Sequence, residues 1–153
     1  MPVLIRLASS FAVLATGLLA GVMLGVAMEQ QTAQTLSANC WIVHQNLNDH
    51  LFRLVMPIAF VISVAGACSA LFLHRGSARV WMVGGVVASL LVVLITIVFE
   101  VPLNDMMAQW RPGHLPSDWS LSRDAWLRNH WWRTLFGVFA FLFSTIADRV
   151  DIH

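Results

Sequence analysis

The sequence predicts an all-α fold: an integral-membrane antiparallel four-helix bundle that forms a single domain over residues 1–153. Long apolar runs, short polar connections and a scarcity of charge predict this fold together. The chain is 58% hydrophobic and 11% charged, whereas a soluble domain carries about 25% charged residues. Its formal net charge of +1 provides no basic surface for a nucleic acid. The expected surroundings are therefore a lipid bilayer, with no nucleic-acid partner.

Three uncharged apolar runs have the length of a membrane span: Leu7–Met28, Leu54–Leu73 and Val80–Phe99. A helix that rises about 1.5 Å per residue needs about 20 residues to cross a hydrocarbon core about 30 Å thick. A fourth run, Thr134–Ala147, has only 14 residues and would reach about 21 Å. The fourth helix must therefore begin earlier in the chain, which brings Arg133 and His130 into or near the membrane.

The first helix is expected over residues 3 to about 28, as a retained anchor. Its apolar run is long for a secretory signal and has no clear cleavage site. Gly17, Gly21 and Gly25 recur at every fourth position, a spacing that lets membrane helices pack closely. Glu29 ends the run, and a polar stretch follows.

The second helix is expected to begin near Ile42 and to end at Leu73. One of its faces carries four polar residues at helical spacing: Asn46, Asp49, His50 and Arg53. Pro57 follows one turn later and is a candidate for a kink. A short polar turn over residues 74–77 then joins the second and third helices as an antiparallel pair.

The third helix is expected from about Val80 to Glu100. Pro102 cannot donate a backbone hydrogen bond, so the helix is expected to bend or end there. A long loop follows, with helix breakers at Pro112, Gly113 and Pro116. The fourth helix is expected to start near residues 120–124 and to run to about Ala147.

The arginines predict the orientation. One side of the predicted bundle carries Arg6, Arg75, Arg79 and Arg149, and the first connection on the opposite side has no basic residue. Because cytoplasmic loops carry an excess of basic residues, we predict a bacterial inner-membrane protein with both termini cytoplasmic. Arg111 and Arg123, in the opposite long connection, count against this orientation.

Polar residues gather at one end of the predicted bundle, because the first and third connections of four antiparallel helices lie on the same side. The residues that map there are Glu29, His44, Asn46, Asp49, His50, Glu100, Asn104, Asp105, His130 and Arg133. The fourth helix adds a face of its own, made of Arg123, Trp126, His130 and Arg133. Ionisable groups inside a membrane are functional candidates, although Glu100 and Arg133 could equally be a structural pair that closes the bundle.

A metal site is one hypothesis for this end. The candidate ligands are His44, His50, His130 and Glu100, whose chemistry suits iron, copper or zinc. An iron or copper ion is thus the candidate cofactor, although the chain has no compact motif such as H-x-x-x-H. In the alternative interpretation, His44 and His50 are interfacial histidines solvated by lipid headgroups.

Several of these residues form a signature that resembles a known family. The signature runs through Val101-Pro102-Leu103-Asn104-Asp105, then Trp110, then Trp126 and His130-x-x-Arg133-Thr134. It resembles the anthrone oxygenase-like family, a large group of small four-helix membrane proteins. Characterised members are associated with the oxidation of anthrones to anthraquinones. The resemblance makes Asn104, His130 and Arg133 the residues to watch, whereas Glu100, Glu29, His44 and His50 depart from the family pattern.

The first function predicted on this basis is an integral-membrane oxygenase or oxidoreductase acting on a hydrophobic, aromatic small molecule. His130 or Glu100 would be the base that removes a proton from carbon. Arg133 and Asn104 would stabilise the enolate oxygen that forms. The aromatic end of the fourth helix, with Trp126, Trp131 and Trp132, would hold the flat substrate.

The second function is non-catalytic. The chain would be an accessory subunit of a larger membrane complex, or part of a homo-oligomer, and would pack through its glycine and aromatic faces. Its polar end would then be structural or would bind a metal. Co-purification would decide between the two functions: a protein that is always found with a larger assembly and has no cavity at the polar end would support the accessory subunit.

Overall fold

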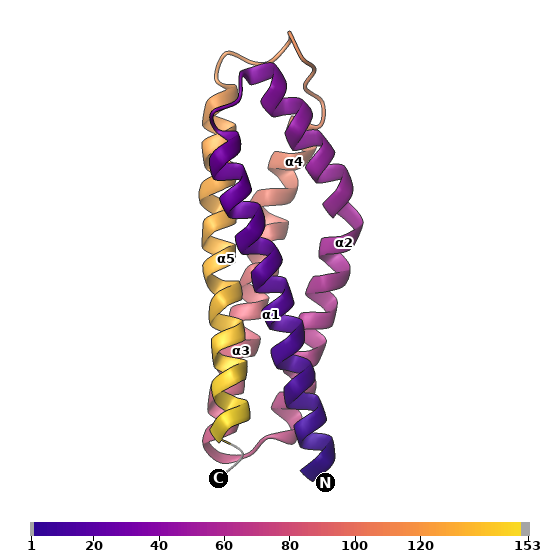
Figure 1. Ribbon diagram of the computed structural model, residues 1–153, viewed down its shortest axis with the longest axis vertical. Helices are drawn as coiled ribbons and strands as arrows, with labels where there is room; N and C mark the ends of the chain where they lie inside the picture. Colours follow the sequence, from indigo (N-terminus) through magenta and orange to yellow (C-terminus); the bar gives the residue numbers. More distant parts are fainter. Residues whose placement is uncertain (1, 151–153) are drawn as a thin grey trace.

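The computed structural model describes residues 2–150 as a bundle of long helices without a strand (Figure 1). The elements are α1 (Pro2–Ala33), α2 (Ala38–Leu73), α3 (Gly76–Ile95), the π-helical turn η1 (Thr96–Glu100), α4 (Val101–Met107) and α5 (Trp119–Val150). Because α3, η1 and α4 follow one another without a break, the chain makes four long helices. The all-α four-helix fold predicted from the sequence is confirmed.

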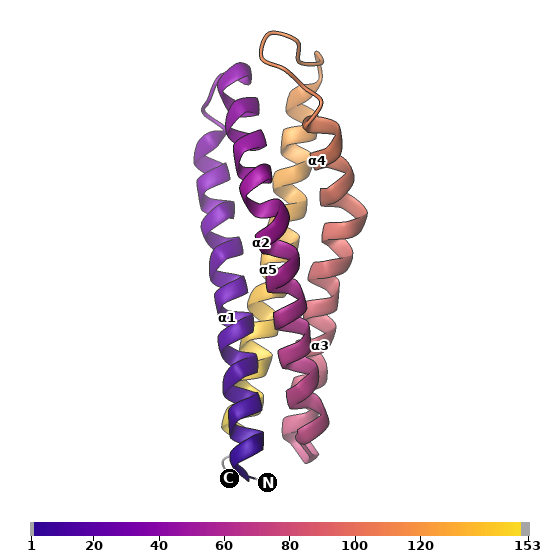
Figure 2. The ribbon, with the colours of Figure 1, turned by 90° about the vertical axis from the view of Figure 1, so that its right-hand side faces the viewer.

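The four helices alternate in direction. α5 packs against α1 and α3, and α2 packs against both of these helices as well. Figures 1 and 2 show that α1 begins and α5 ends at the same end of the bundle, which we call the termini end. The loop of residues 108–118 lies at the other end, which we call the loop end. Which side of a membrane the termini end faces stays a prediction.

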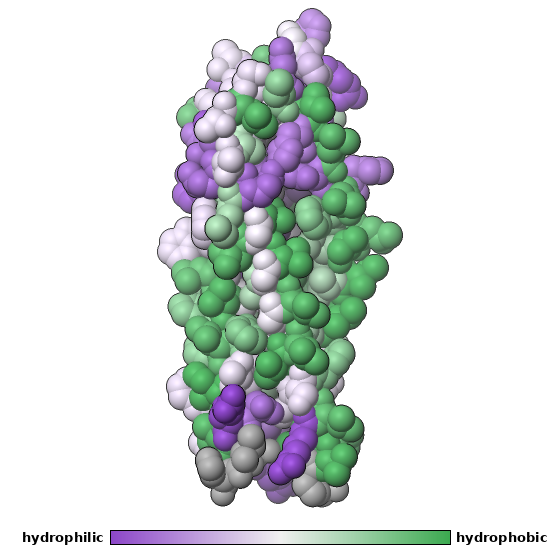
Figure 3. Space-filling model, viewed as in Figure 1, coloured by the Kyte–Doolittle hydropathy of each residue, from purple (hydrophilic) through white to green (hydrophobic). Residues whose placement is uncertain are grey.

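Three helices are long and apolar enough to cross a membrane, over Val3–Ala33, Ala38–Leu73 and Gly76–Met107. The 36 residues of α2 make about 54 Å of helix, whereas a hydrocarbon core is about 30 Å thick. Figure 3 shows an apolar surface over the middle of the bundle, with polar residues towards both ends. The bundle is therefore a membrane protein whose last turns near the loop end project beyond the apolar middle.

The helices extend further than the apolar runs predicted. α1 continues five residues past Met28 to Ala33, and α2 begins at Ala38, four residues before the predicted Ile42. An uncharged run stops at its first charged or polar residue, whereas a helix stops only where its repeating backbone hydrogen bonds end. The polar residues of the loop end consequently stand on helices and have fixed directions.

Pro102 neither ends the third helix nor leaves it regular. In a regular α-helix its ring would press against the carbonyl group four residues earlier, and its missing N–H would break a hydrogen bond. Here the preceding turn, η1, is widened, and the backbone N–H of Val101 donates to the carbonyl of Thr96, five residues back. Such π turns insert one extra residue and are frequent at functional sites. Glu100 belongs to this turn and is buried.

Small side chains hold the helices together near the termini end. Ala12, Ala67, Ala70 and Ala147 form a buried cluster with Met82. A Cβ atom placed on Gly66 would come within 3.1 Å of the Phe11 ring and 3.4 Å of the Ala12 backbone. The glycines of α1 contribute less than their spacing suggested. Only Gly17 has a close neighbour, and Gly21 and Gly25 face open space.

Candidate functional site

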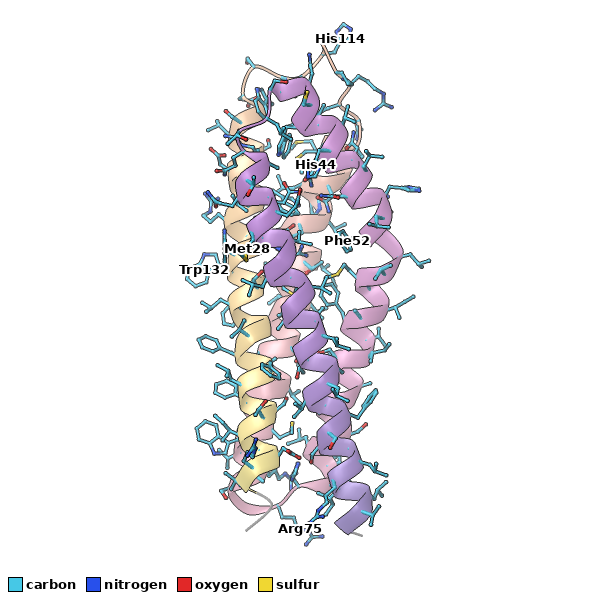
Figure 4. The ribbon with its side chains drawn as sticks, in the orientation of Figure 1. Met28, His44, Phe52, Arg75, His114 and Trp132 are labelled. Atoms are coloured by element: carbon cyan, nitrogen blue, oxygen red, sulfur yellow. The ribbon has the colours of Figure 1, made fainter. Side chains whose placement is uncertain are left out.

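A cavity of about 330 Å³ lies between the helices in the half of the bundle nearest the loop end. Its volume is at the lower end of the range of small-molecule sites, about 300–1,000 Å³. Apolar side chains from α1 and α2 form much of the wall: Met23, Val26, Phe52, Met56, Pro57 and Phe60. Figure 4 places Phe52 between α1 and α2. The opposite wall comes from η1, α4 and α5 and is polar.

Arg133 is the centre of the polar wall. Its guanidinium donates from Nε and Nη2 to Nδ1 of His130, over 3.1 and 2.6 Å, and from Nη1 to the hydroxyl of Thr96 over 3.2 Å. Nη2 also lies 3.7 Å from a carboxylate oxygen of Glu100. Arg133 is only 7% exposed. The short fourth run therefore predicted its position inside the bundle correctly.

Both ring nitrogens of His130 are engaged. Nδ1 accepts from Arg133, and Nε2 lies 2.9 Å from the carbonyl oxygen of Met23 on α1. A carbonyl can only accept a hydrogen bond, so Nε2 carries the ring proton and donates it. His130 could take a further proton only by giving up its bond to Arg133.

Glu100 is the opposite case. Its side chain is 1% exposed, and neither carboxylate oxygen accepts a hydrogen bond from any residue among 2–150. A buried acceptor without a partner costs free energy, and most buried polar groups in folded proteins are paired. Glu100 lines the cavity, and neither of its buried oxygens is committed to a hydrogen bond with another described residue.

Asn104 is oriented by Trp126. The indole N–H of Trp126 donates to Oδ1 of Asn104 over 2.7 Å, and the indole ring stacks on His130 with ring centroids 4.9 Å apart. An indole N–H is only a donor, which determines that the amide oxygen of Asn104 faces it. The NH₂ group of Asn104 is left as a donor on a residue that lines the cavity.

An ion-paired arginine bridges two of the helices that line the cavity. Nη2 of Arg53 on α2 lies 3.0 Å from Asp49, one turn earlier, and 3.2 Å from Asp105 on α4. The i, i+4 pair of Asp49 and Arg53 was predicted from their spacing. Arg53 and Asp105 are both largely exposed, so this bridge marks the solvent side of the cavity.

The predicted set of metal ligands does not assemble. Among residues 2–150, no three His, Cys, Asp or Glu side chains group closely enough to hold a metal ion. His44 pairs with Glu29 and contacts Asn48, and His50 is exposed. Only His130 and Glu100 of the predicted ligands line the cavity. The expectation that His44 or His50 shares this cavity is therefore wrong, and the four predicted ligands do not group into a metal site.

Other parts of the predicted site also need correction. Trp131 and Trp132 are 40% and 54% exposed, and Figure 4 shows Trp132 pointing away from the bundle. Arg123 stacks on Trp119 and pairs with Asp124 instead of facing the cavity. On the predicted polar face of α2, Asp49 and Arg53 line the cavity, but Asn46 and His50 do not.

Four polar cavity residues were not predicted: Thr96, Gln30, Gln45 and Asn48. Thr96 stands inside an apolar run, where nothing in the sequence marks it. Gln45 precedes Asp49 by four residues and so shares its helical face, a spacing that could have identified it. Gln30 lies beyond the predicted end of the first helix.

A family model described as anthrone oxygenase matches residues 45–143. The match covers well over half of the 153 residues. The chain belongs to the anthrone oxygenase family. The matched segment contains every cavity residue from α2, η1, α4 and α5, whereas α1 and His44 lie outside it. No curated protein and no solved structure matches the chain.

Proposed function

We propose that this member of the anthrone oxygenase family is an oxygenase that oxidises a flat, apolar aromatic substrate at an activated CH₂ group. The observation that carries the proposal is the carboxylate of Glu100, buried and without a hydrogen-bond partner among the described residues, in the wall of a largely apolar cavity. A cavity at the polar end also favours an enzyme over an accessory subunit, for which that end would be packed solid.

The reaction would begin with removal of a proton from carbon. In an anthrone the CH₂ group lies between two aromatic rings and opposite a carbonyl, so the charge left by the proton can move to the carbonyl oxygen. Glu100 is the proposed base, because its oxygens are free whereas both nitrogens of His130 are engaged. His130 is then a positioning residue that holds Arg133.

Two donors are available to the oxygen that becomes negative. Arg133 supplies a guanidinium in the cavity wall, and Asn104 supplies the NH₂ group that its bond to Trp126 leaves unused. Donors that are held in place before the reaction stabilise developing charge at little cost of reorganisation. These residues would therefore lower the barrier to proton removal.

Molecular oxygen would then oxidise the carbanion. Addition of O₂ and return of the proton give a hydroperoxide on the same carbon, which loses water to leave a carbonyl. The CH₂ group and O₂ become C=O and H₂O, so one O₂ is consumed for each substrate molecule. The apolar wall around Met23, Phe52 and Phe60 would keep bulk water away from the carbanion.

The proposal is tested with purified protein, anthrone and an oxygen electrode. We expect one O₂ consumed per anthraquinone formed. Glu100→Gln keeps the shape of the side chain but removes the base, and should lower the rate by about 10²–10⁴-fold. Glu29→Gln is the matched control, because Glu29 pairs with His44 outside the cavity. A Glu100→Gln variant as active as the wild type would exclude Glu100 as the base.

A further inference from the structure

Two glutamines line the cavity towards the loop end, and no step of the proposed reaction uses them. Gln30 on α1 and Gln45 on α2 are 3% and 2% exposed, and Nε2 of Gln30 donates to Oε1 of Gln45 over 3.1 Å. Gln30 follows Met23, the anchor of His130, by seven residues. That separation is about 10 Å of helix rise. The glutamine pair and the Arg133 network therefore lie at different levels of one cavity, with the glutamines nearer the loop end.

The pair has hydrogen-bonding capacity left. A primary amide offers two N–H donors and a carbonyl oxygen that accepts. The single bond between them leaves the carbonyl oxygen of Gln30 and the NH₂ group of Gln45 with no other hydrogen bond among residues 2–150. If both amides were turned over, the unused groups would exchange places. In either assignment the pair presents one donor and one acceptor.

We propose that Gln30 and Gln45 form a second subsite, which binds a hydroxyl group at the far end of the aromatic substrate. A phenolic hydroxyl both donates and accepts, which matches the two unused groups. A ring without such a substituent would displace water and leave both amides without partners, a loss that polar sites use for discrimination. The inference rests on the proposed function in one respect, namely that the same cavity holds the substrate.

A purely structural role makes a different prediction. An interhelical hydrogen bond between α1 and α2 would support the cavity whatever ligand it holds. The chain also provides a matched control, because Nε2 of Gln31 donates to Oε1 of Gln34 over 3.2 Å on the exposed surface. Methionine is the substitution of choice, since it is unbranched, flexible and apolar.

The test compares the binding of two ligands that differ at one position, 2-hydroxyanthraquinone and 2-methylanthraquinone. Their dissociation constants are measured by quenching of tryptophan fluorescence in detergent, which needs no turnover. We expect the wild type to bind the hydroxylated ligand about 3- to 10-fold more tightly. Gln30→Met and Gln45→Met should lose this preference, and Gln31→Met should keep it. If a methionine variant does not fold, Gln45→Asn, which withdraws the amide by one methylene, replaces it.

Three results would overturn the subsite: equal affinity of the wild type for the two ligands, a preference that survives in both cavity variants, or a loss of affinity that is equal for both ligands. Anthrone oxidation by the wild-type protein is measured in parallel with the binding of the two ligands. A protein that oxidises anthrone but does not discriminate keeps the proposed function and loses the subsite. A protein that discriminates through Gln30 and Gln45 but does not oxidise anthrone keeps the subsite and loses the proposed function.

Discussion

The two halves of the bundle pack their helices in opposite ways. Near the termini end, alanines and glycines allow close approach, as where Gly66 on α2 meets Phe11 and Ala12 on α1. Near the loop end, larger side chains such as Met23 and Phe60 hold α1 and α2 apart around the cavity. One pair of helices thus packs closely near the termini end and encloses a binding space nearer the loop end.

Buried polar atoms without a hydrogen-bond partner among the described residues occur in both halves, and the indole nitrogen of Trp41 is one of them near the loop end. The hydroxyls of Ser63, Ser89 and Ser144 are buried without a hydrogen-bond partner among the described residues, but none of them lines the cavity. The carboxylate of Glu100 likewise accepts no hydrogen bond, although Arg133 lies 3.7 Å away, and it does line the cavity. An unpartnered buried group therefore indicates function only where a ligand has room to reach it.

The largest loss of stability is expected from a variant that disrupts the polar network around the cavity. Arg133→Ala leaves Glu100 and His130 buried without their shared partner, and removal of one member of a buried pair typically costs about 3–5 kcal/mol. Thermal or chemical unfolding in detergent measures the loss, and anthrone oxidation should fall with it. Arg128→Ala on the same helix is the control, because Arg128 is exposed. An Arg133→Ala variant as stable as the wild type would show that the network does not hold the helices.

A smaller loss of stability is expected from a variant that disturbs only the tightly packed half. Gly66→Leu forces a large side chain against Phe11 and the backbone of Ala12, and overpacking of this kind costs about 1–3 kcal/mol. Anthrone oxidation per folded molecule should stay near that of the wild type, because the cavity is elsewhere. Gly21→Leu is the control, since a Cβ at Gly21 meets nothing within 4 Å. If Gly66→Leu abolished activity without loss of stability, the two halves would not be independent.

Trp126→Phe tests whether the hydrogen bond that orients Asn104 in the cavity wall matters to the reaction. The aromatic ring and its stacking on His130 remain, but the donor to Asn104 is lost. A single hydrogen bond contributes about 1 kcal/mol, so the turnover of anthrone should fall roughly 3- to 10-fold with little change in stability. An unchanged turnover would mean that the orientation of Asn104 does not matter to the reaction.

The smallest effect is expected at His50. Because it is exposed and lies outside the cavity, His50→Ala should change stability by no more than about 0.5 kcal/mol and leave turnover intact. Metal analysis of the purified wild type and the variant provides the sharper comparison. A metal content that disappeared with His50 would revive the site that the geometry of these residues does not support.

The sequence predicted the parts of the site that follow from length and spacing. A fourth run too short to span placed Arg133 inside the bundle, and a helical repeat put Trp126, His130 and Arg133 on one face. The predicted set of metal ligands was wrong, and the spacing of two of its residues already shows why. His44 and His50 are six residues apart, or about 600° of helix rotation, so they point in clearly different directions.

Other features could not be read from the sequence. The face of α2 that lines the cavity carries Phe52, Met56 and Phe60 beside Asp49. The predicted face of α2 was chosen from the polar residues alone, and that face is turned slightly away from the cavity. The engagement of both His130 nitrogens depends on a carbonyl of α1, more than 100 residues away in the chain. Contacts of that kind exist only once the helices are placed.

The π turn has a consequence for the phase of the third long helix. Each residue of an α-helix turns the chain by about 100°, so the extra residue in η1 rotates α4 relative to α3. A variant that lacks one residue of Thr96–Glu100 should lose the hydrogen bond between Trp126 and Asn104, and a structure that retained it would contradict this. Related chains could carry the same Val101–Asp105 segment and still present a different face to the cavity. What the segment does depends on the turn before it as much as on its own residues.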